Sequence, residues 1–310
     1  MAIPQLTLNP LARDILLEHI KRFLNAFEER TQTRGTYEHA LKEFLRWYEQ
    51  DGMCRFAVDD VLRYRDYLSK LKKLAPASVA TYLNGLRQFC EYLLQRGMLE
   101  CNPARFVRYS RIPRLTSLEV LTPDEVDRLI GFVDQRSGRG RRDLVVIRLM
   151  VQFGLSEAEL VKTDVRDYVC IGARGALKVQ DREGENESSV VLLTPDMTRL
   201  MNDYLAAREG LEKNHPLFLS DGTRVRGERM TVRGIRERVH HYLAAAGITN
   251  RGLRRVTPKA LRHTAAMLMA QAGASADEIK HHMRLGSLAK ALRYVNQQSV
   301  QSPSTHLTTP

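Results

Sequence analysis

Residues 257–296 read TPKALRHTAAMLMAQAGASADEIKHHMRLGSLAKALRYVN. Thr257 and Pro258 predict the start of a helix, because a hydroxyl residue followed by proline is typical of a first helical turn. Lys259 and Arg262 lie three positions apart, so they share one face of that helix. Two cations beside the free N–H groups of a helix N-terminus form a candidate phosphate site. Lys-x-x-Arg is also common on solvated helix faces, so the pattern alone does not decide the function.

This stretch resembles the C-terminal half of the catalytic domain of the tyrosine recombinase (phage integrase) family. The likeness rests on the run from Lys259 to Thr264, on a helix ending near Gly273, and on the spacing between Arg262 and Tyr294. Without that context, the tyrosine in ALRYVN would be taken for a half-buried packing residue. The resemblance implies that Tyr294 is the nucleophile that attacks DNA, that Arg262 is the second arginine of the site, and that Lys259 fills a position held by His or Lys.

Such a site is built for phosphoryl transfer. A tyrosine phenolate attacks the phosphodiester in line and forms a phosphotyrosine link that conserves the bond energy, so neither a metal nor a cofactor is expected. Charge accumulates on the non-bridging oxygens, where arginine stabilises it through a bidentate fork. A general acid protonates the leaving sugar oxygen.

The family's first arginine has no direct counterpart here. It follows Gly-Leu in the family, and in GLSEAEL of this chain Ser156 stands in its place. A neutral hydroxyl does not replace a guanidinium, and loss of one such donor commonly costs about 10²–10³ in rate. A cation from elsewhere could replace it, either from a partner subunit or from a nearby residue. The candidates in this chain are Arg148, Arg284, His281 and His282.

Two further positions depart from the family pattern. Where the family has His or Trp, counting back from the tyrosine gives Leu285, and anchoring on Gly286 gives Ser287. The family's hairpin lysine has only weak counterparts, which are Arg182 in an acidic predicted turn and Lys178 before it. We therefore hold Ser156 and Leu285 to be degenerate positions of the site.

The N-terminal part, residues 11–102, is predicted to be a helical domain. Its apolar residues recur at intervals of three and four, as in amphipathic helices. We expect helices over 13–27 and 58–71, one that begins near a Thr33 cap, and one that follows Pro76. The domain resembles the helical core-binding (SAM-like) domain of the same family, which implies a clamp around duplex DNA. The segments that carry this likeness are 36–48, 77–93 and Asn102-Pro103.

Residues 103–120 are expected to link this domain to the next one. The segment holds prolines, and its stretch from Arg105 to Arg114 carries four arginines and no acid, the other two being Arg108 and Arg111. A solvated basic loop is one interpretation. A strap that lies along DNA phosphates between two domains is the other.

Residues 121–296 are predicted to form the catalytic domain, which is mainly helical with a small β-sheet (α+β). One helix opens after a Thr122 cap, and another covers 142–153 and ends at Gly154. Residues 176–179 and 189–193 predict a β-hairpin. Residues 1–10 and 297–310 are expected to be tails, the second polar and without strong helical periodicity.

Composition favours a DNA-binding protein. The chain has 310 residues, 43% of them hydrophobic, which suits about two domains. Lys and Arg number 48 against 36 Asp and Glu, giving a net charge of +12, which favours an anionic partner. No segment approaches the roughly 18 apolar residues of a membrane span, and no signal peptide is apparent, so we expect a cytoplasmic, nucleoid-associated protein of bacterial type. The cysteines lack metal-ligand spacing, and we expect all four to be buried thiols.

Basic side chains in both domains are candidates for DNA binding. Most would contact phosphates and position the protein, while helix side chains in the major groove would read the sequence. Any one of them is equally well explained as a solvated charge. The candidates are Lys70, Lys72, Lys73, Arg87, Arg105, Arg108, Arg111, Arg251, Arg254 and Arg255, with Arg229, Arg233, Arg236 and Arg238 on a further predicted helix.

Three functions are compatible with these observations, and the third is that of a DNA-bridging or regulatory protein that reuses the clamp. The first is that of a site-specific recombinase or integrase of a mobile element, as in transposition, which cleaves and rejoins DNA through Tyr294. The second is that of a pseudoenzyme that binds double-stranded DNA without cutting it, as a partner of an active, paralogous recombinase. Either of the first two would act as a homo- or hetero-oligomer on DNA. Arg262 and Tyr294 favour the first function, and Ser156 and Leu285 favour the second.

Overall fold

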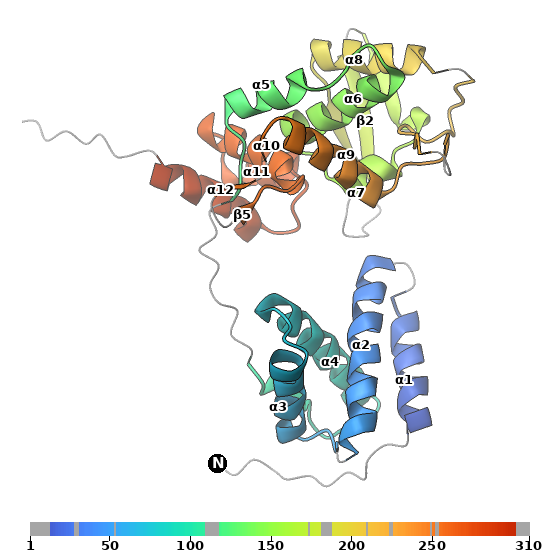
Figure 1. Cartoon of the computed structure of the whole chain (residues 1–310), viewed down its shortest axis with the longest axis vertical. Helices are drawn as coiled ribbons and strands as arrows, with labels where there is room; N and C mark the ends of the chain where they lie inside the picture. The colour runs from blue at the N-terminus through green and yellow to red at the C-terminus, as the bar shows by residue number, and fades with distance from the viewer. Residues whose placement is uncertain are drawn as a thin grey trace, which may run out of the picture. The chain divides into compact units, whose positions relative to one another are not determined.

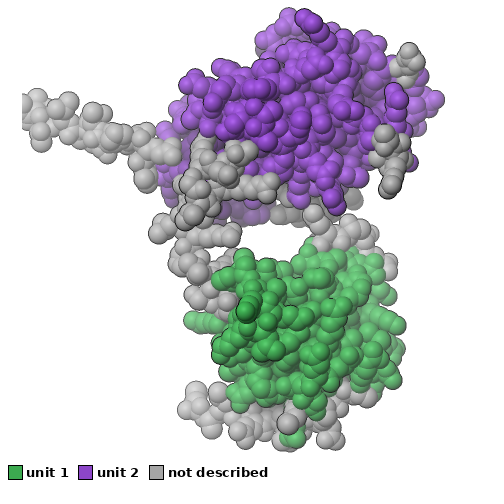
Figure 2. Space-filling view, in the orientation of Figure 1, with its two compact units in different colours: residues 1–115 green, residues 116–310 purple. Residues whose placement is uncertain are grey.

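A computed structural model describes residues 13–27, 31–52, 54–108, 118–172, 174–180, 188–208, 210–222, 226–248, 250–251 and 254–301. The chain divides into two compact units, residues 1–115 and 116–310 (Figure 2). Each unit has a hydrophobic core of its own. The boundary falls within the predicted linker, of which residues 109–117 lie outside the described part of the chain.

The first unit is a bundle of helices, shown in blue to teal in Figure 1. The four α-helices found among its described residues pack their apolar stripes into a core rich in aromatic rings, among them Phe44, Tyr64 and Phe89. Such rings bury large areas and favour edge-to-face contacts, which this core contains between Phe23 and Phe89 and between Phe44 and Tyr64. In chain order the elements are α1 (Arg13–Asn25), α2 (Thr31–Asp51), α3 (Val58–Asp66), the π-helical turn η1 (Tyr67–Leu71), α4 (Pro76–Gln95) and the 3-10 turn η2 (Pro103–Arg105).

The predicted helices of this unit are confirmed with shifted ends. The second helix already includes Thr33, so Thr33 does not cap it. The helix expected over 58–71 changes from α to π geometry at Tyr67. The first residues of the predicted linker belong to this unit, because Ala104 and Val107 are buried in its core.

The prediction of four buried cysteines is wrong for two of them. Cys54 and Cys90 are buried in the first unit, and burial raises the pKa of both thiols. Cys101 and Cys170 are exposed. Cys170 lies on an edge strand whose residues 169–171 are all exposed, a placement that composition does not reveal.

The second unit confirms the mainly helical fold with a small sheet. It opens with α5 (Pro123–Gly131), α6 (Gly138–Phe153) and α7 (Glu157–Lys162), followed by η3 (Val165–Asp167). The Thr122 cap is confirmed, with the Glu125 carboxylate bonded back to the Thr122 backbone N–H. Helix α6 begins four residues earlier than predicted, because Ser137 caps it, and it ends as predicted at Gly154, which adopts a left-handed conformation with φ of 63°.

The sheet has three antiparallel strands in the order β1-β2-β3. The predicted hairpin is confirmed by β2 (Arg174–Gln180) and β3 (Ser188–Leu192), in which Leu177 lies opposite Val191. Strand β1 (Tyr168–Ile171) was not predicted, because a strand of four residues carries too little alternation to be recognised.

The remaining elements build the C-terminal half of this unit. They are α8 (Pro195–Ala206), α9 (Val232–Ala245), the paired short strands β4 (Asn250–Arg251) and β5 (Arg254–Arg255), α10 (Lys259–Gln271), α11 (Ala276–His282) and α12 (Leu288–Gln301). The helix expected to start at Thr257 and Pro258 is confirmed as α10, which begins at Lys259 with Pro258 at its N-cap. The expectation that residues 297–310 form a tail without helical structure is wrong as far as Gln301, because α12 continues to that residue. Residues 302–310 lie outside the described part of the chain.

Candidate active site

Three helices gather the predicted site residues at the C-terminal end of the second unit. Helix α10 packs against α6, α11 and α12, and α11 packs against α12, as the orange to red elements in Figure 1 show. Arg262 and His263 lie on the first turns of α10. Tyr294 lies on α12, and Arg284 lies in the turn between α11 and α12. The fold therefore brings residues from four separate segments, with α7 as the fourth, into one cluster.

The carboxylate of Glu159 is the centre of this cluster. Its side chain is 0% exposed, and its two oxygens bind two guanidinium groups. Oε2 accepts from Nη1 of Arg262 at 2.5 Å, and Oε1 accepts from Nε of Arg284 at 2.6 Å. Burial alone would raise the pKa of Glu159, but the charges of Arg262 and Arg284 outweigh it and hold that pKa below its usual value. The cluster keeps one net positive charge, because two cations share one anion.

Ser156, which occupies the place of the family's first arginine, caps the N-terminus of α7. Its Oγ accepts from the backbone N–H of Glu159, and its own N–H donates to the Glu159 carboxylate at 2.6 Å. Its side chain is buried. Ser156 thus fixes the position of Glu159, which in turn holds the two arginines.

Arg284 reaches the chain segment that precedes Ser156. Its guanidinium donates to the carbonyl oxygens of Gly154 and Phe153 as well as His282, and its side chain is 3% exposed. The backbone of Arg284 has a φ of 50°, a left-handed conformation that costs a non-glycine residue roughly 1–2 kcal/mol. The bonds to Glu159 and to the three carbonyl groups offset that cost. A guanidinium from the α11–α12 turn therefore lies next to the loop whose own arginine is missing.

The hydroxyl of Tyr294 contacts the imidazole of His263. The Tyr294 Oη and His263 Nδ1 atoms are 2.7 Å apart, and the direction of the bond depends on the imidazole tautomer. Tyr294 is 5% exposed. Burial raises the pKa of its phenol, while the charges of Arg262 and Arg293 act in the opposite direction. Burial, together with Lys259, Arg293 and Arg262, lowers the pKa of His263 to about 4, so this imidazole is neutral at pH 7.

The other predicted site residues are placed around this cluster or away from it. Lys259 is exposed at the first position of α10, one turn before His263. Leu285 is half-buried against the small core formed by α10, α11 and α12, so it packs where the family has a polar group. Lys178 is exposed on β2, opposite Val190. Arg182 lies outside the described residues.

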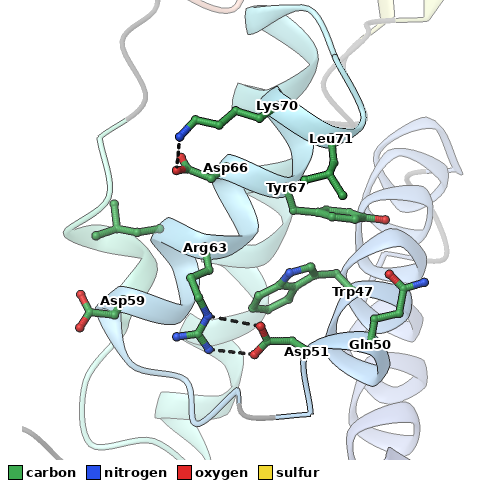
Figure 3. Close-up of a pocket in the computed structure, with 10 residues that line it drawn as sticks. Trp47, Gln50, Asp51, Asp59, Arg63, Asp66, Tyr67, Lys70 and Leu71 are labelled. Carbon is green, nitrogen blue, oxygen red and sulfur yellow. Dashed lines mark hydrogen bonds and ion pairs between the residues drawn. The ribbon is translucent and has the colours of Figure 1, made fainter.

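Some DNA-binding candidates of the first unit form ion pairs or hydrogen bonds within the protein, and others are exposed. Lys70 pairs with Asp66 at the rim of a hollow in which Arg63 also pairs with Asp51 (Figure 3). Lys72 pairs with Glu43. Lys73 and Arg108 are exposed. Arg105 pairs with Glu91, and the guanidinium of Arg87 donates to the carbonyl groups of Ala104 and Val107.

In the second unit, the basic candidates on α9 are paired with acids. Arg233 pairs with Glu237, and Arg236 pairs with Glu157 on α7. Arg238 binds Asp143, and Arg229, just before α9, binds Asp164. The backbones of Arg251, Arg254 and Arg255 form β4 and β5, but their side chains are outside the description, and Arg111 lies outside it altogether.

Sequence reasoning missed the roles of Glu159 and His263. Both stood in the quoted motifs, yet neither was singled out, because acidic residues and histidines on helices are common. A signal was available for Glu159, since it follows Ser156 by three positions, which is the spacing of a capping box. No comparable local signal marks His263, whose partner is 31 residues away in the chain.

Within the described residues, no helix is long and apolar enough to cross a membrane. No group of three or more His, Cys, Asp or Glu side chains in that same part of the chain is arranged to hold a metal ion.

Comparison with known proteins identifies the family. The model of the "Phage integrase family" matches residues 119–300, and that of the "Phage integrase, N-terminal SAM-like domain" matches residues 16–99. The chain is 27% identical over 295 residues to tyrosine recombinase XerC of Pelobacter propionicus, covering 91% of each protein. It is 29% identical over 238 residues to XerC of Myxococcus xanthus, covering 74% of this chain and 75% of that protein.

Solved structures share the fold at low identity. The XerH recombinase bound to a palindromic difH substrate is 16% identical with a TM-score of 0.71, covering 97% of this chain and 98% of the other. The Tn1549 transposon integrase in complex with transposon right end DNA is 16% identical with a TM-score of 0.66, covering 91% and 98%. The resemblance expected from the Lys259 to Tyr294 segment is confirmed, and the chain belongs to the phage integrase family of tyrosine recombinases.

Proposed function

We propose that this protein cleaves and rejoins DNA at a specific site, with Tyr294 as the nucleophile. The observation that carries the proposal is the cluster around Glu159, in which two guanidinium groups are fixed on one buried carboxylate and Tyr294 lies within range of the Arg262 charge. A preorganised positive site of this kind stabilises the charge that develops on an attacked phosphate.

The residues have distinct roles in this proposal. The Tyr294 oxygen forms a bond to phosphorus while the bond from phosphorus to the sugar oxygen breaks, and the sugar oxygen takes up a proton. Arg262 and Lys259 contact the phosphate. Arg284 is a positioning residue, because its nitrogen atoms bind Glu159 and backbone carbonyl groups, so it acts by holding Glu159 and by its charge. The charge of Arg284 compensates in part for the neutral Ser156.

The substrate in this proposal is double-stranded DNA of a mobile element, bound in the cytoplasm of a bacterial-type cell. The relatives are named as tyrosine recombinases, and one structure of the same fold is a transposon integrase in complex with transposon end DNA. The net charge of +12 supports binding to a polyanion. Another structure with this fold is described as a dimer bound to a core site, which supports assembly of this chain as an oligomer on paired DNA sites.

A second candidate function is that of a non-cleaving partner that binds the DNA site beside an active, paralogous recombinase. Ser156 favours it, because its side chain is buried as a helix cap and places no cation on the phosphate. Leu285 favours it too, because a half-buried aliphatic side chain donates no hydrogen bond.

One experiment separates the two functions. A library of random duplexes is first selected for binding, and the selected sequence is built into a nicked duplex that traps the cleaved product. The wild-type protein should form a covalent protein–DNA band that resists denaturing detergent, and Tyr294→Phe should form none. If the wild type binds the duplex but forms a band only when a recombinase of the same element is added, the partner function is correct. If it binds no sequence at all, both proposals are wrong.

A further inference from the structure

The contact between His263 and Tyr294 assigns a further catalytic residue to the reaction. We propose that His263 is the general base that accepts the phenolic proton of Tyr294 as this oxygen attacks the phosphate. This inference rests on the proposed cleavage activity. Arg262 and Lys259 stabilise the phosphate in that reaction, but neither cation takes the proton from the nucleophile.

Geometry is the first support. A base has to lie within about 2.6–3.2 Å of the atom whose proton it takes, and Nδ1 of His263 lies 2.7 Å from the Tyr294 oxygen. The two side chains come from α10 and α12, which pack against each other, so the pair is held by the fold on both sides. Tyr294 is buried and His263 is half-buried beside it, so the imidazole, rather than bulk water, is placed to receive the proton.

Electrostatics supplies the second support. The charged neighbours that act on His263 are Lys259 and Arg262 from its own helix and Arg293 from α12, and all three disfavour the imidazolium. The free protein therefore keeps His263 neutral, with a lone pair available. A DNA phosphate that binds to Lys259 and Arg262 brings negative charge into the same space and counteracts their effect, which raises the basicity of His263. The base thus gains strength when the substrate is bound.

In the proposed step, one proton moves from Tyr294 to His263 while one bond to phosphorus forms and another breaks. The Tyr294 oxygen forms its bond to phosphorus, and its proton moves to Nδ1 of His263, giving an imidazolium beside the phosphotyrosine. The bond between phosphorus and the sugar oxygen breaks, and the sugar oxygen takes a proton from water or from a cationic side chain of the site. In rejoining, the imidazolium returns its proton to the departing Tyr294 oxygen, as microscopic reversibility requires.

Single-turnover cleavage of the nicked duplex described above tests the assignment. His263→Asn is the decisive variant, because its amide oxygen can still accept a hydrogen bond near the Nδ1 position but does not take up a proton. We expect it to bind the duplex like the wild type and to form the covalent adduct about 10²–10⁴ times more slowly. His215→Ala is the matched control: it removes a half-buried histidine from a surface turn and should leave the rate unchanged.

Fluorotyrosine at position 294 distinguishes a base from a residue that only positions the nucleophile. Fluorine lowers the pKa of the phenol, so the nucleophile needs less help with its proton. The ratio of the wild-type cleavage rate to the His263→Asn rate should therefore decrease by tenfold or more as fluorine atoms are added to Tyr294. A constant difference would show that His263 only positions Tyr294, and a His263→Asn rate within threefold of wild type would also overturn the inference. Absence of adduct from the wild type itself would instead overturn the proposed cleavage activity.

Discussion

Replacing Glu159 with glutamine should destabilise the second unit strongly while leaving the shape of the side chain almost unchanged. The carboxylate holds Arg262 and Arg284, whose side chains are only 7% and 3% exposed. In Glu159→Gln both guanidinium groups stay in the interior without a counter-charge. Removing one partner of a buried ion pair typically costs about 3–5 kcal/mol, and here two cations lose the same partner. We therefore expect the free energy of unfolding to fall by at least about 3 kcal/mol.

Urea denaturation can assign this loss to the correct unit. The only tryptophan of the chain, Trp47, lies in the core of the first unit, so its fluorescence follows that unit alone. Circular dichroism follows the helices of both units. With a slope of roughly 1–3 kcal/mol per molar urea, the dichroism transition of the second unit should move to lower urea by about 1–3 M. The Trp47 transition should stay in place.

Glu157→Gln is the matched control for this prediction. Glu157 lies on the same helix and pairs with Arg236, whose side chain is 53% exposed. Exposed pairs contribute about 0–1 kcal/mol because water screens them. If Glu159→Gln destabilises the protein no more than Glu157→Gln does, Glu159 is not the centre of the cluster and our account of the site is refuted.

Three further predictions concern backbone, pH and salt. Gly154→Ala should lower the free energy of unfolding by about 2–4 kcal/mol in the same urea assay. The backbone φ of Gly154 is 63°, and a Cβ atom at this position would overlap Met283. A loss below about 1 kcal/mol would contradict this prediction. Folding lowers the pKa of His263 from 6.5 to about 4. At a pH between these two values, the His263 imidazole is protonated in the unfolded chain but neutral in the folded chain. Stability should therefore decrease by up to about 3 kcal/mol as the pH is lowered from 7 to 4, and the decrease should be smaller in His263→Asn. DNA affinity should fall steeply as salt is added. If the exposed Arg108 contacts a phosphate, Arg108→Ala should reduce the slope of log K against log salt concentration by about one. An unchanged slope would show that Arg108 does not contact the DNA.

Local patterns in the sequence were enough to predict most helices and the family. The capping box at Thr122 and the glycine stop at Gly154 act through neighbouring residues, so they can be recognised from the sequence alone. The short strand β1 and the helical continuation of α12 could not, because pairing with β2 and packing against α10 and α11 decide them. Tertiary contacts override weak local preference in both cases.

The candidate site shows a similar division. The positions of Lys259, Arg262 and Tyr294 follow from a motif, but the partners of Arg262 do not. Glu159 is 103 residues away from Arg262 and 125 residues away from Arg284, so only the folded chain shows that one carboxylate serves both. Ser156 illustrates the consequence: in the sequence it marks a missing cation, whereas in the structure a guanidinium from another segment lies beside its loop.

In the proposed reaction, the Tyr294 oxygen becomes covalently attached to DNA. The most direct test of this attachment is mass spectrometry of the protein after reaction with the nicked duplex and digestion by nuclease and protease. The account predicts a peptide containing Tyr294 that carries a nucleotide phosphate, formed by the protein without any partner. A cleaved duplex with the nucleotide on another residue, or an unmodified Tyr294 peptide from protein that is fully bound to its DNA site, would contradict it.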